Sequence, residues 1–277
     1  MPKAFTSEDF LICVEAVNKN NYVYGNDVLY RAFDLRVLPH PSVSKPGVGE
    51  LSSALWVIGK AYSADPTRSA STTLIASSGL GLSFNTIALG IVGHSEYKTF
   101  YKKLVGLKDK KYTFVWEQDK AIVQECIACL DMLNSMIKDV MGSGSHNVVS
   151  FCSKFLHFMC PDVFFIIDSL SLAGGITLYS GWGTRVFEAE MLPAADWLEI
   201  ADAAREYFKA ESAYQSIGMS DIACSDDAKV YRMHCRRAYA FAVYLNKNGQ
   251  VCAPQIKGIG ASSYMPRLVD SVLMRIK

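Results

Sequence analysis

NVVSFCSKFLHFMCPDVFFIIDSLS, residues 147–171, combines a helix, a break, a buried run and a single carboxylate. Apolar residues recur at helical spacing from Val148 to Met159, which predicts a helix. Pro161 ends it, because proline lacks the amide hydrogen and its ring clashes with the preceding turn. The wholly apolar run 163–167 that follows predicts a buried segment, and Asp168 closes it.

A second stripe on the same predicted helix is polar. It consists of Ser150, Ser153, Lys154 and His157, at positions i, i+3, i+4 and i+7. This stripe gives a polar face to a helix that is otherwise fit for burial. Asp168 precedes Ser169, where a further helix is predicted to begin, and a carboxylate at a helix N-terminus is favoured by the helix dipole.

Two interpretations of these side chains remain open from the residues alone. In the structural interpretation, Asp168 is a helix cap, Lys154 is a solvated surface lysine and His157 is a satisfied core histidine. In the functional interpretation, the buried run holds Asp168 in place as a reactive carboxylate, and Lys154 acts with it.

The order of features in 141–171 resembles the helix-hairpin-helix DNA glycosylases. Met141-Gly142-Ser143-Gly144-Ser145 stands where that family has its glycine hairpin, although the family's usual Leu-Pro is absent. More narrowly, SKFLHFMCPDVFFIIDS is similar to a bacterial group with the 8-oxoguanine glycosylase (OGG) fold. In that superfamily a lysine is the amine nucleophile of the bifunctional enzymes, and an aspartate supports departure of the base. The resemblance assigns these roles to Lys154 and Asp168, which lie fourteen positions apart.

The resemblance implies an all-α, helix-hairpin-helix (OGG-type) fold of about ten helices with little or no sheet. Residues 1–277 would form a single domain, or two helical lobes with the active-site cleft between them. The implied activity is hydrolysis of the N-glycosidic bond of a modified base flipped out of double-stranded DNA, with or without a lyase step. Bacterial relatives include proteins that act against phage, and one excises glucosylated hydroxymethylcytosine; a defence role of that kind is a further expectation.

The resemblance also implies where DNA would lie. Backbone amides of the hairpin would hold a phosphate. The basic outer stripe of the predicted helix 226–246 independently adds two arginines to the expected DNA contacts. The residues expected at the DNA are Gly142, Ser143, Gly144, Ser145, His146, Arg232 and Arg236. The residues expected to line the base pocket are Trp56, Tyr62, Arg68, His157 and Trp182.

Charge is unevenly distributed along a nearly neutral chain. The formal net charge is +1, yet segment 229–277 carries nine Lys or Arg residues against one acid, Asp270. A second basic cluster lies between Lys98 and Lys111. Two such patches fit a polyanionic partner such as DNA, although lysine-rich helices are often only solvated faces.

Composition narrows the class of protein. The chain of 277 residues is 50% hydrophobic, enough for a substantial core, and it has no apolar run long enough to span a membrane. Acids near the N-terminus argue against a secretory signal, and eight scattered cysteines favour a reducing cytoplasm. Cys126 and Cys129 fall on an apolar helix stripe, so we predict packing rather than metal binding. No phosphate-binding glycine loop is present, so we do not expect nucleotide binding. We also expect a monomer without metal or cofactor.

Periodicity predicts helices along most of the chain. The predicted helical ranges are 7–18, 26–35, 49–64, 84–92, 96–107, 117–140, 147–159, 194–212, 226–246 and 266–277. Two rivals to the glycosylase remain. One is a non-catalytic all-α module that binds nucleic acid through the basic C-terminal helices. The other is a helical toxin acting on RNA through His234 and Arg237, which sit at i and i+3.

Overall fold

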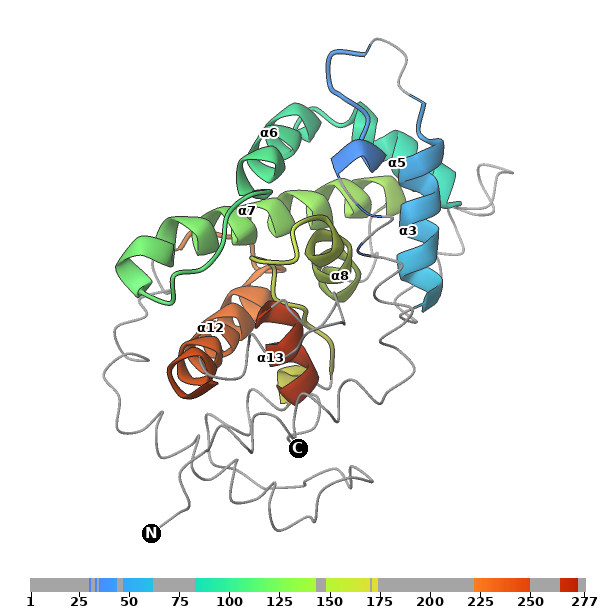
Figure 1. The fold of residues 1–277 in the computed structure, drawn as a ribbon. Coiled ribbons are helices and arrows are strands. Elements are labelled where there is room, and N and C mark those ends of the chain that lie inside the picture. Colours follow the sequence, from blue (N-terminus) through green and yellow to red (C-terminus); the bar gives the residue numbers. More distant parts are fainter. Residues whose placement is uncertain are drawn as a thin grey trace.

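The computed structural model describes part of the chain, and the described part is helical. The described residues are Tyr30, Phe33, 35–43, 47–61, 83–142, 148–169, 171–173, 222–249 and 265–273. They contain no strand, which confirms the all-α class; the finer OGG type is taken up below (Figure 1). The elements are η1 (Leu35–Val37), α3 (Gly49–Ala61), α5 (Phe84–Gly93), α6 (Tyr97–Leu107), α7 (Trp116–Met141), α8 (Val149–Met159), α12 (Lys229–Gly249) and α13 (Met265–Leu273).

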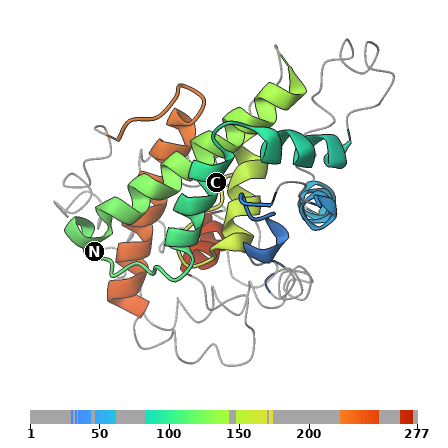
Figure 2. The ribbon, with the colours of Figure 1, turned by 90° about the horizontal axis from the view of Figure 1, so that it is seen from above.

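Helix α7 is the centre of the described fold. It contacts α5, α6, α8 and α12, and these helices surround it in the two views of Figures 1 and 2. Its inward stripe, which includes Cys126, Leu130 and Ile137, is fully or almost fully buried. The long core helix predicted from periodicity is therefore confirmed.

Both ends of α7 are fixed by specific contacts. At the start, the buried carboxylate of Asp119 accepts hydrogen bonds from Thr113 N, Phe114 N and the hydroxyl of Tyr239. These bonds hold Phe114 in the left-handed region at φ 62°. At the other end, Gly142 has φ 87°, a conformation in which a glycine is strongly preferred.

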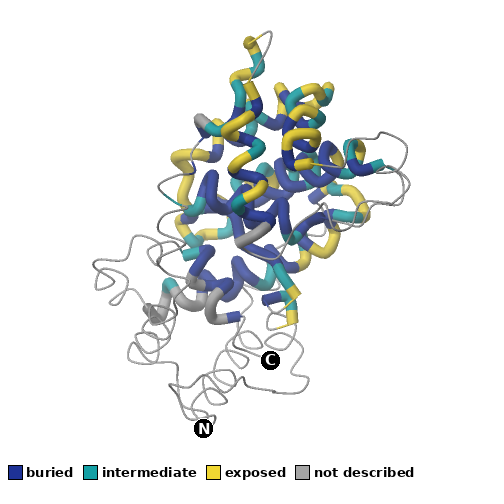
Figure 3. Tube along the Cα trace, turned by 90° about the vertical axis from the view of Figure 1, so that its right-hand side faces the viewer, coloured by how far each residue is buried: buried dark blue, intermediate teal, exposed yellow. Residues whose placement is uncertain are grey.

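The run predicted to be buried is buried, and it belongs to neither helix nor strand. Residues 163–167 are at most 3% exposed, and side chains of both α8 and α12 contact them. Buried residues, drawn dark blue in Figure 3, fill the middle of the described part of the chain. Since no strand in the described ranges pairs with them, side chains bond their backbone instead. The carbonyls of Val163, Phe164, Phe165 and Ile166 accept from Tyr112, His157, Tyr231 and His234, at 2.6, 2.8, 3.0 and 2.8 Å respectively. This bonding fixes the path that leads to Asp168.

Most helix predictions that fall on described residues are confirmed within a few positions. The predicted helix 26–35 is described only at Tyr30, Phe33 and Leu35, and the last of these begins a 3-10 turn. The predicted helices 7–18 and 194–212 lie outside the described residues. Within the described ranges, no helix is both long and apolar enough to cross a membrane.

Candidate active site

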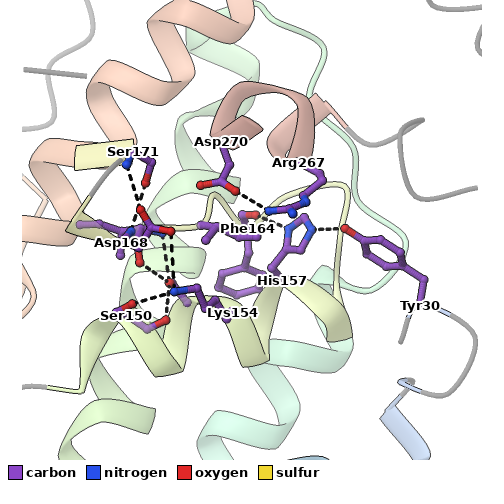
Figure 4. Close-up of polar contacts among 12 residues, drawn as sticks. Tyr30, Ser150, Lys154, His157, Phe164, Asp168, Ser171, Arg267 and Asp270 are labelled. Carbon is purple, nitrogen blue, oxygen red and sulfur yellow. Dashed lines mark hydrogen bonds and ion pairs between the residues drawn. The ribbon is translucent and has the colours of Figure 1, made fainter. Parts of the chain in front are cut away.

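The fold brings Lys154 and Asp168 together. Lys154 lies in the middle of α8, Asp168 follows the buried run, and Lys154 Nζ is 3.8 Å from Asp168 Oδ2 (Figure 4). Their side chains are only 7% and 21% exposed, respectively. The two residues that the glycosylase resemblance assigns to catalysis are therefore neighbours in a largely buried ion pair.

Lys154 is not the solvated surface lysine of the structural interpretation. α8 is buried on almost every side, so its polar stripe faces the protein interior. Lys154 Nζ donates a hydrogen bond to Ser150 Oγ at 3.0 Å. Burial lowers the pKa of Lys154 below its ordinary value, while the nearby carboxylates of Asp168 and Asp270 act in the opposite direction. The amine is therefore easier to deprotonate than a surface lysine.

Asp168 is a helix cap, as the structural interpretation predicted, and it also faces Lys154. Its Oδ1 accepts from Ser171 N at 2.9 Å, and its own amide donates to Ser171 Oγ at 3.1 Å. Such a reciprocal pair is a capping box. Because capping uses Oδ1, it leaves Oδ2 directed at Lys154 (Figure 4).

Sequence reasoning missed the contribution of α13. Arg267 Nη1 donates to Asp270 Oδ2, and this buried pair lies beside Lys154 and Asp168 in Figure 4. Burial raises the pKa of Asp270 to about 6, although Arg267 opposes the rise. The signal available in the sequence was that Asp270 is the one acid among many bases in segment 229–277.

His157 is a structural histidine here, not a residue with a free ring edge for a base. Its Nδ1 donates to the carbonyl of Phe164 at 2.8 Å, and its Nε2 accepts from the hydroxyl of Tyr30. Burial lowers the pKa of His157 to about 3, so the ring is neutral at neutral pH. The core interpretation of His157 fits this geometry better than the base-pocket prediction.

The other predicted pocket residues are not gathered at the pair in the described part of the chain. Trp56 lies on α3 and is 53% exposed. Tyr62, Arg68 and Trp182 lie outside the described residues, so their predicted roles stay predictions.

Among the predicted DNA contacts, three are described. Gly142 ends α7 with a positive φ, as a turn requires, whereas Ser143, Gly144, Ser145 and His146 lie outside the described residues. Arg232 Nη1 donates to the carbonyl of Ile222 at 2.7 Å, which ties it to the segment before α12. Arg232 and Arg236 are half-buried rather than fully outward.

Cys126 and Cys129 behave as packing residues. Cys126 and Cys129 are free thiols buried on α7, and burial raises the pKa of both. The packing interpretation of this pair is therefore confirmed. Among the described residues, no group of three His, Cys, Asp or Glu side chains is placed to hold a metal ion.

No protein-family model, curated protein or solved structure matches the chain. The resemblance of residues 141–171 to the glycosylases therefore stays a prediction. What the protein does has to be inferred from the side chains themselves.

Proposed function

We propose that the protein is a DNA glycosylase, which cuts the N-glycosidic bond of a flipped, modified base and leaves an abasic site. The observation that carries the proposal is the placement of Lys154 Nζ 3.8 Å from Asp168 Oδ2. The resemblance of 141–171 to the helix-hairpin-helix glycosylases assigns the roles of that family's lysine and aspartate to these two residues. The all-α architecture is compatible with that fold.

Asp168 would stabilise the transition state. Breaking an N-glycosidic bond gives the sugar oxocarbenium character, and a fixed carboxylate nearby lowers the energy of that cation. The cap to Ser171 and the bonded run before Asp168 hold the carboxylate in place before substrate arrives. A preorganised negative charge of this kind needs little reorganisation during the reaction.

Lys154 would act as an amine nucleophile or as a phosphate contact. Its pKa is lowered by burial, which favours the neutral amine that attacks a sugar carbon. Attack at C1′ would displace the base and give a covalent imine with the opened sugar, which a lyase step would then resolve. If water is the nucleophile instead, Lys154 stays a cation and contacts DNA phosphate.

DNA would reach the site from the hairpin side. Gly142 begins the connection between α7 and α8, where backbone amides would bind a phosphate. Exposed Lys98 and Lys102 on α6, with Lys108 and Lys110 after it, add positive charge for a polyanion. The identity of the modified base is part of the same proposal. Glucosylated hydroxymethylcytosine is one candidate, and the resemblance alone suggests it.

The RNA-toxin rival is less well supported. His234 is fully buried, and its Nε2 donates to the carbonyl of Ile166 at 2.8 Å. Burial lowers the pKa of His234 to about 4, so it holds the buried run rather than facing a substrate. The experiment below distinguishes the non-catalytic binding module from the glycosylase.

The test incubates purified protein with DNAs that are unmodified, oxidised, alkylated, uracil-containing, or from phage with glucosylated hydroxymethylcytosine. Mass spectrometry detects released base. Release from one DNA that is lost in Asp168→Asn supports the proposal. Asn retains the capping oxygen, so this variant is expected to fold. DNA binding without release from any DNA, unchanged in Asp168→Asn, would favour the binding module.

A second experiment separates the two roles of Lys154. Borohydride reduces an imine to a stable amine, so a bifunctional enzyme is trapped on its DNA. We expect trapping in the wild type and none in Lys154→Gln. Lys120→Gln is the control, because Lys120 lies in the first turns of α7, at the end of that helix opposite to Gly142. Base release without trapping would assign Lys154 to phosphate binding.

A further inference from the structure

The Arg267–Asp270 pair of α13 has a feature that simple helix packing does not explain. Asp270 is 1% exposed, and its Oδ2 accepts from Arg267. Its Oδ1 is buried and has no partner at hydrogen-bond distance among the described residues, although the hydroxyl of Ser171 lies close enough to lower the pKa of Asp270. A buried carboxylate oxygen that lacks a partner is costly, so such a group usually has a role beyond packing.

Asp270 belongs to one buried cluster of charges drawn from three elements. Lys154 comes from α8, Asp168 from the segment after it, and Arg267 and Asp270 from α13 (Figure 4). Asp270 interacts electrostatically with each of the other three. Among the described residues, two cations therefore face two carboxylates, and these four charges cancel when all of them are ionised.

Among the described residues, the other polar groups near these four charges add no charge that acts on Lys154. The nearby histidines are His157 of α8 and His234 of α12, and burial lowers both pKa values well below neutral pH. Arg237 of α12 acts on His234. Ser150 and Ser171 supply only neutral hydrogen-bonding groups. Within the described part of the chain, Asp168 and Asp270 are thus the two negative charges that act on Lys154.

We propose that Asp270 is a positioning residue of the site, whose buried carboxylate keeps Lys154 protonated and paired with Asp168 before substrate binds. Without that charge, two cations would face a single carboxylate, and loss of the lysine proton would relieve the excess. The reactivity of Lys154 would then be set from α13, more than a hundred positions along the chain. A catalytic role for this control of Lys154 rests on the proposed function. The effect of Asp270 on the protonation of Lys154 does not depend on it.

The test measures Lys154 directly and uses no DNA. Protein labelled with carbon-13 at the lysine ε position is titrated by NMR, and the resonance of Lys154 is assigned by its absence in Lys154→Gln. In Asp270→Asn, we expect the titration midpoint of Lys154 to fall by roughly half a pH unit or more. Asp227→Asn, which removes a carboxylate paired with Lys138, is the matched control and should leave the midpoint unchanged.

A second variant covers the case in which Asp270→Asn does not fold. Arg267→Gln with Asp270→Asn leaves no unpaired buried charge, so it is expected to fold better. Asp270 affects the pKa of Lys154 more strongly than Arg267 does, so the midpoint should still fall, by less. An unchanged or raised midpoint in a folded variant, judged by circular dichroism, would overturn the proposal.

The same variants connect the inference to activity. If Lys154 is the nucleophile, the pH profile of borohydride trapping should move to lower pH in Asp270→Asn. If no DNA is ever trapped or cut, the glycosylase proposal fails while the titration still decides the role of Asp270. The two failures are therefore distinguishable.

Discussion

Ser153 Oγ accepts a hydrogen bond from the amide of Ile167 at 3.1 Å, and this bond sets the register between α8 and the buried run. Each partner directly precedes one member of the candidate catalytic pair, Lys154 and Asp168. A bond between the preceding residues therefore holds the two functional side chains side by side. The 3.8 Å separation of Lys154 and Asp168 depends on tertiary contacts made by their neighbours.

Removing the Ser153 hydroxyl should destabilise the protein. In Ser153→Ala the buried amide of Ile167 loses its partner, which costs about 1–3 kcal/mol. Urea unfolding measures the change, with Ser53→Ala on the exposed face of α3 as the control. A loss no larger than in the control would show that the Ser153 bond does not hold the run.

Replacing Gly90 should destabilise the contact between α5 and α7. A Cβ atom there would lie 2.0 Å from Val140 Cγ2, so Gly90→Ala forces the helices apart and is expected to cost about 1–3 kcal/mol. Gly106→Ala on α6 meets nothing within 4 Å and should be neutral or stabilising by helix propensity. Thermal unfolding of the two variants gives the comparison. Equal stability of both would contradict the close packing.

The buried histidines should make the protein sensitive to acid. The pKa of His157 is lowered to about 3, so its contribution to stability is present above the unfolded pKa, near 6.5, and is lost as pH falls toward 3. Compared with His157→Gln, the wild type should lose about 1.4 kcal/mol per pH unit below 6.5. Urea unfolding at several pH values between 4 and 8 measures this. A difference that is constant with pH would contradict it.

Asp270 should have the opposite pH dependence. Its pKa is raised from 3.8 to about 6, so its contribution is present below pH 3.8 and is lost as pH rises through 6. The free energy of unfolding of the wild type, measured relative to Asp270→Asn, should therefore fall between pH 4 and 7. The raised pKa corresponds to about 3 kcal/mol at most. A relative stability that rises over this range would mean that Asp270 is not a strained buried carboxylate.

Local pattern was enough to predict much of the fold. The helical spacing of apolar residues predicted α7 and α8, and Pro161 predicted the break after α8. The wholly apolar sequence of 163–167 predicted that this segment is buried. The cap at Asp168 was also predictable, because capping depends on residues near in sequence. Residues that are close together in the sequence determine these features.

The surroundings of the site were not predictable in the same way. A lysine on a polar stripe is usually solvated, yet Lys154 is buried beside Asp168 and interacts electrostatically with Arg267 and Asp270 of α13. Arg267 and Asp270 at i and i+3 look in sequence like an ordinary surface pair, and only the tertiary fold buries them. The hydroxyl of Tyr231 and the ring of His234, which bond the buried run from α12, also carry no local signal.

The comparison that tests the central claim most directly is abasic-site formation by the wild type and by Asp168→Asn on the DNA panel, read with an aldehyde-reactive probe. Asp226→Asn, at an exposed carboxylate before α12, is the matched control. We predict abasic sites in one modified DNA with the wild type and Asp226→Asn, and at least a hundredfold fewer with a folded Asp168→Asn, as expected for loss of a group that stabilises the transition state. Abasic sites formed equally well by Asp168→Asn would contradict the account.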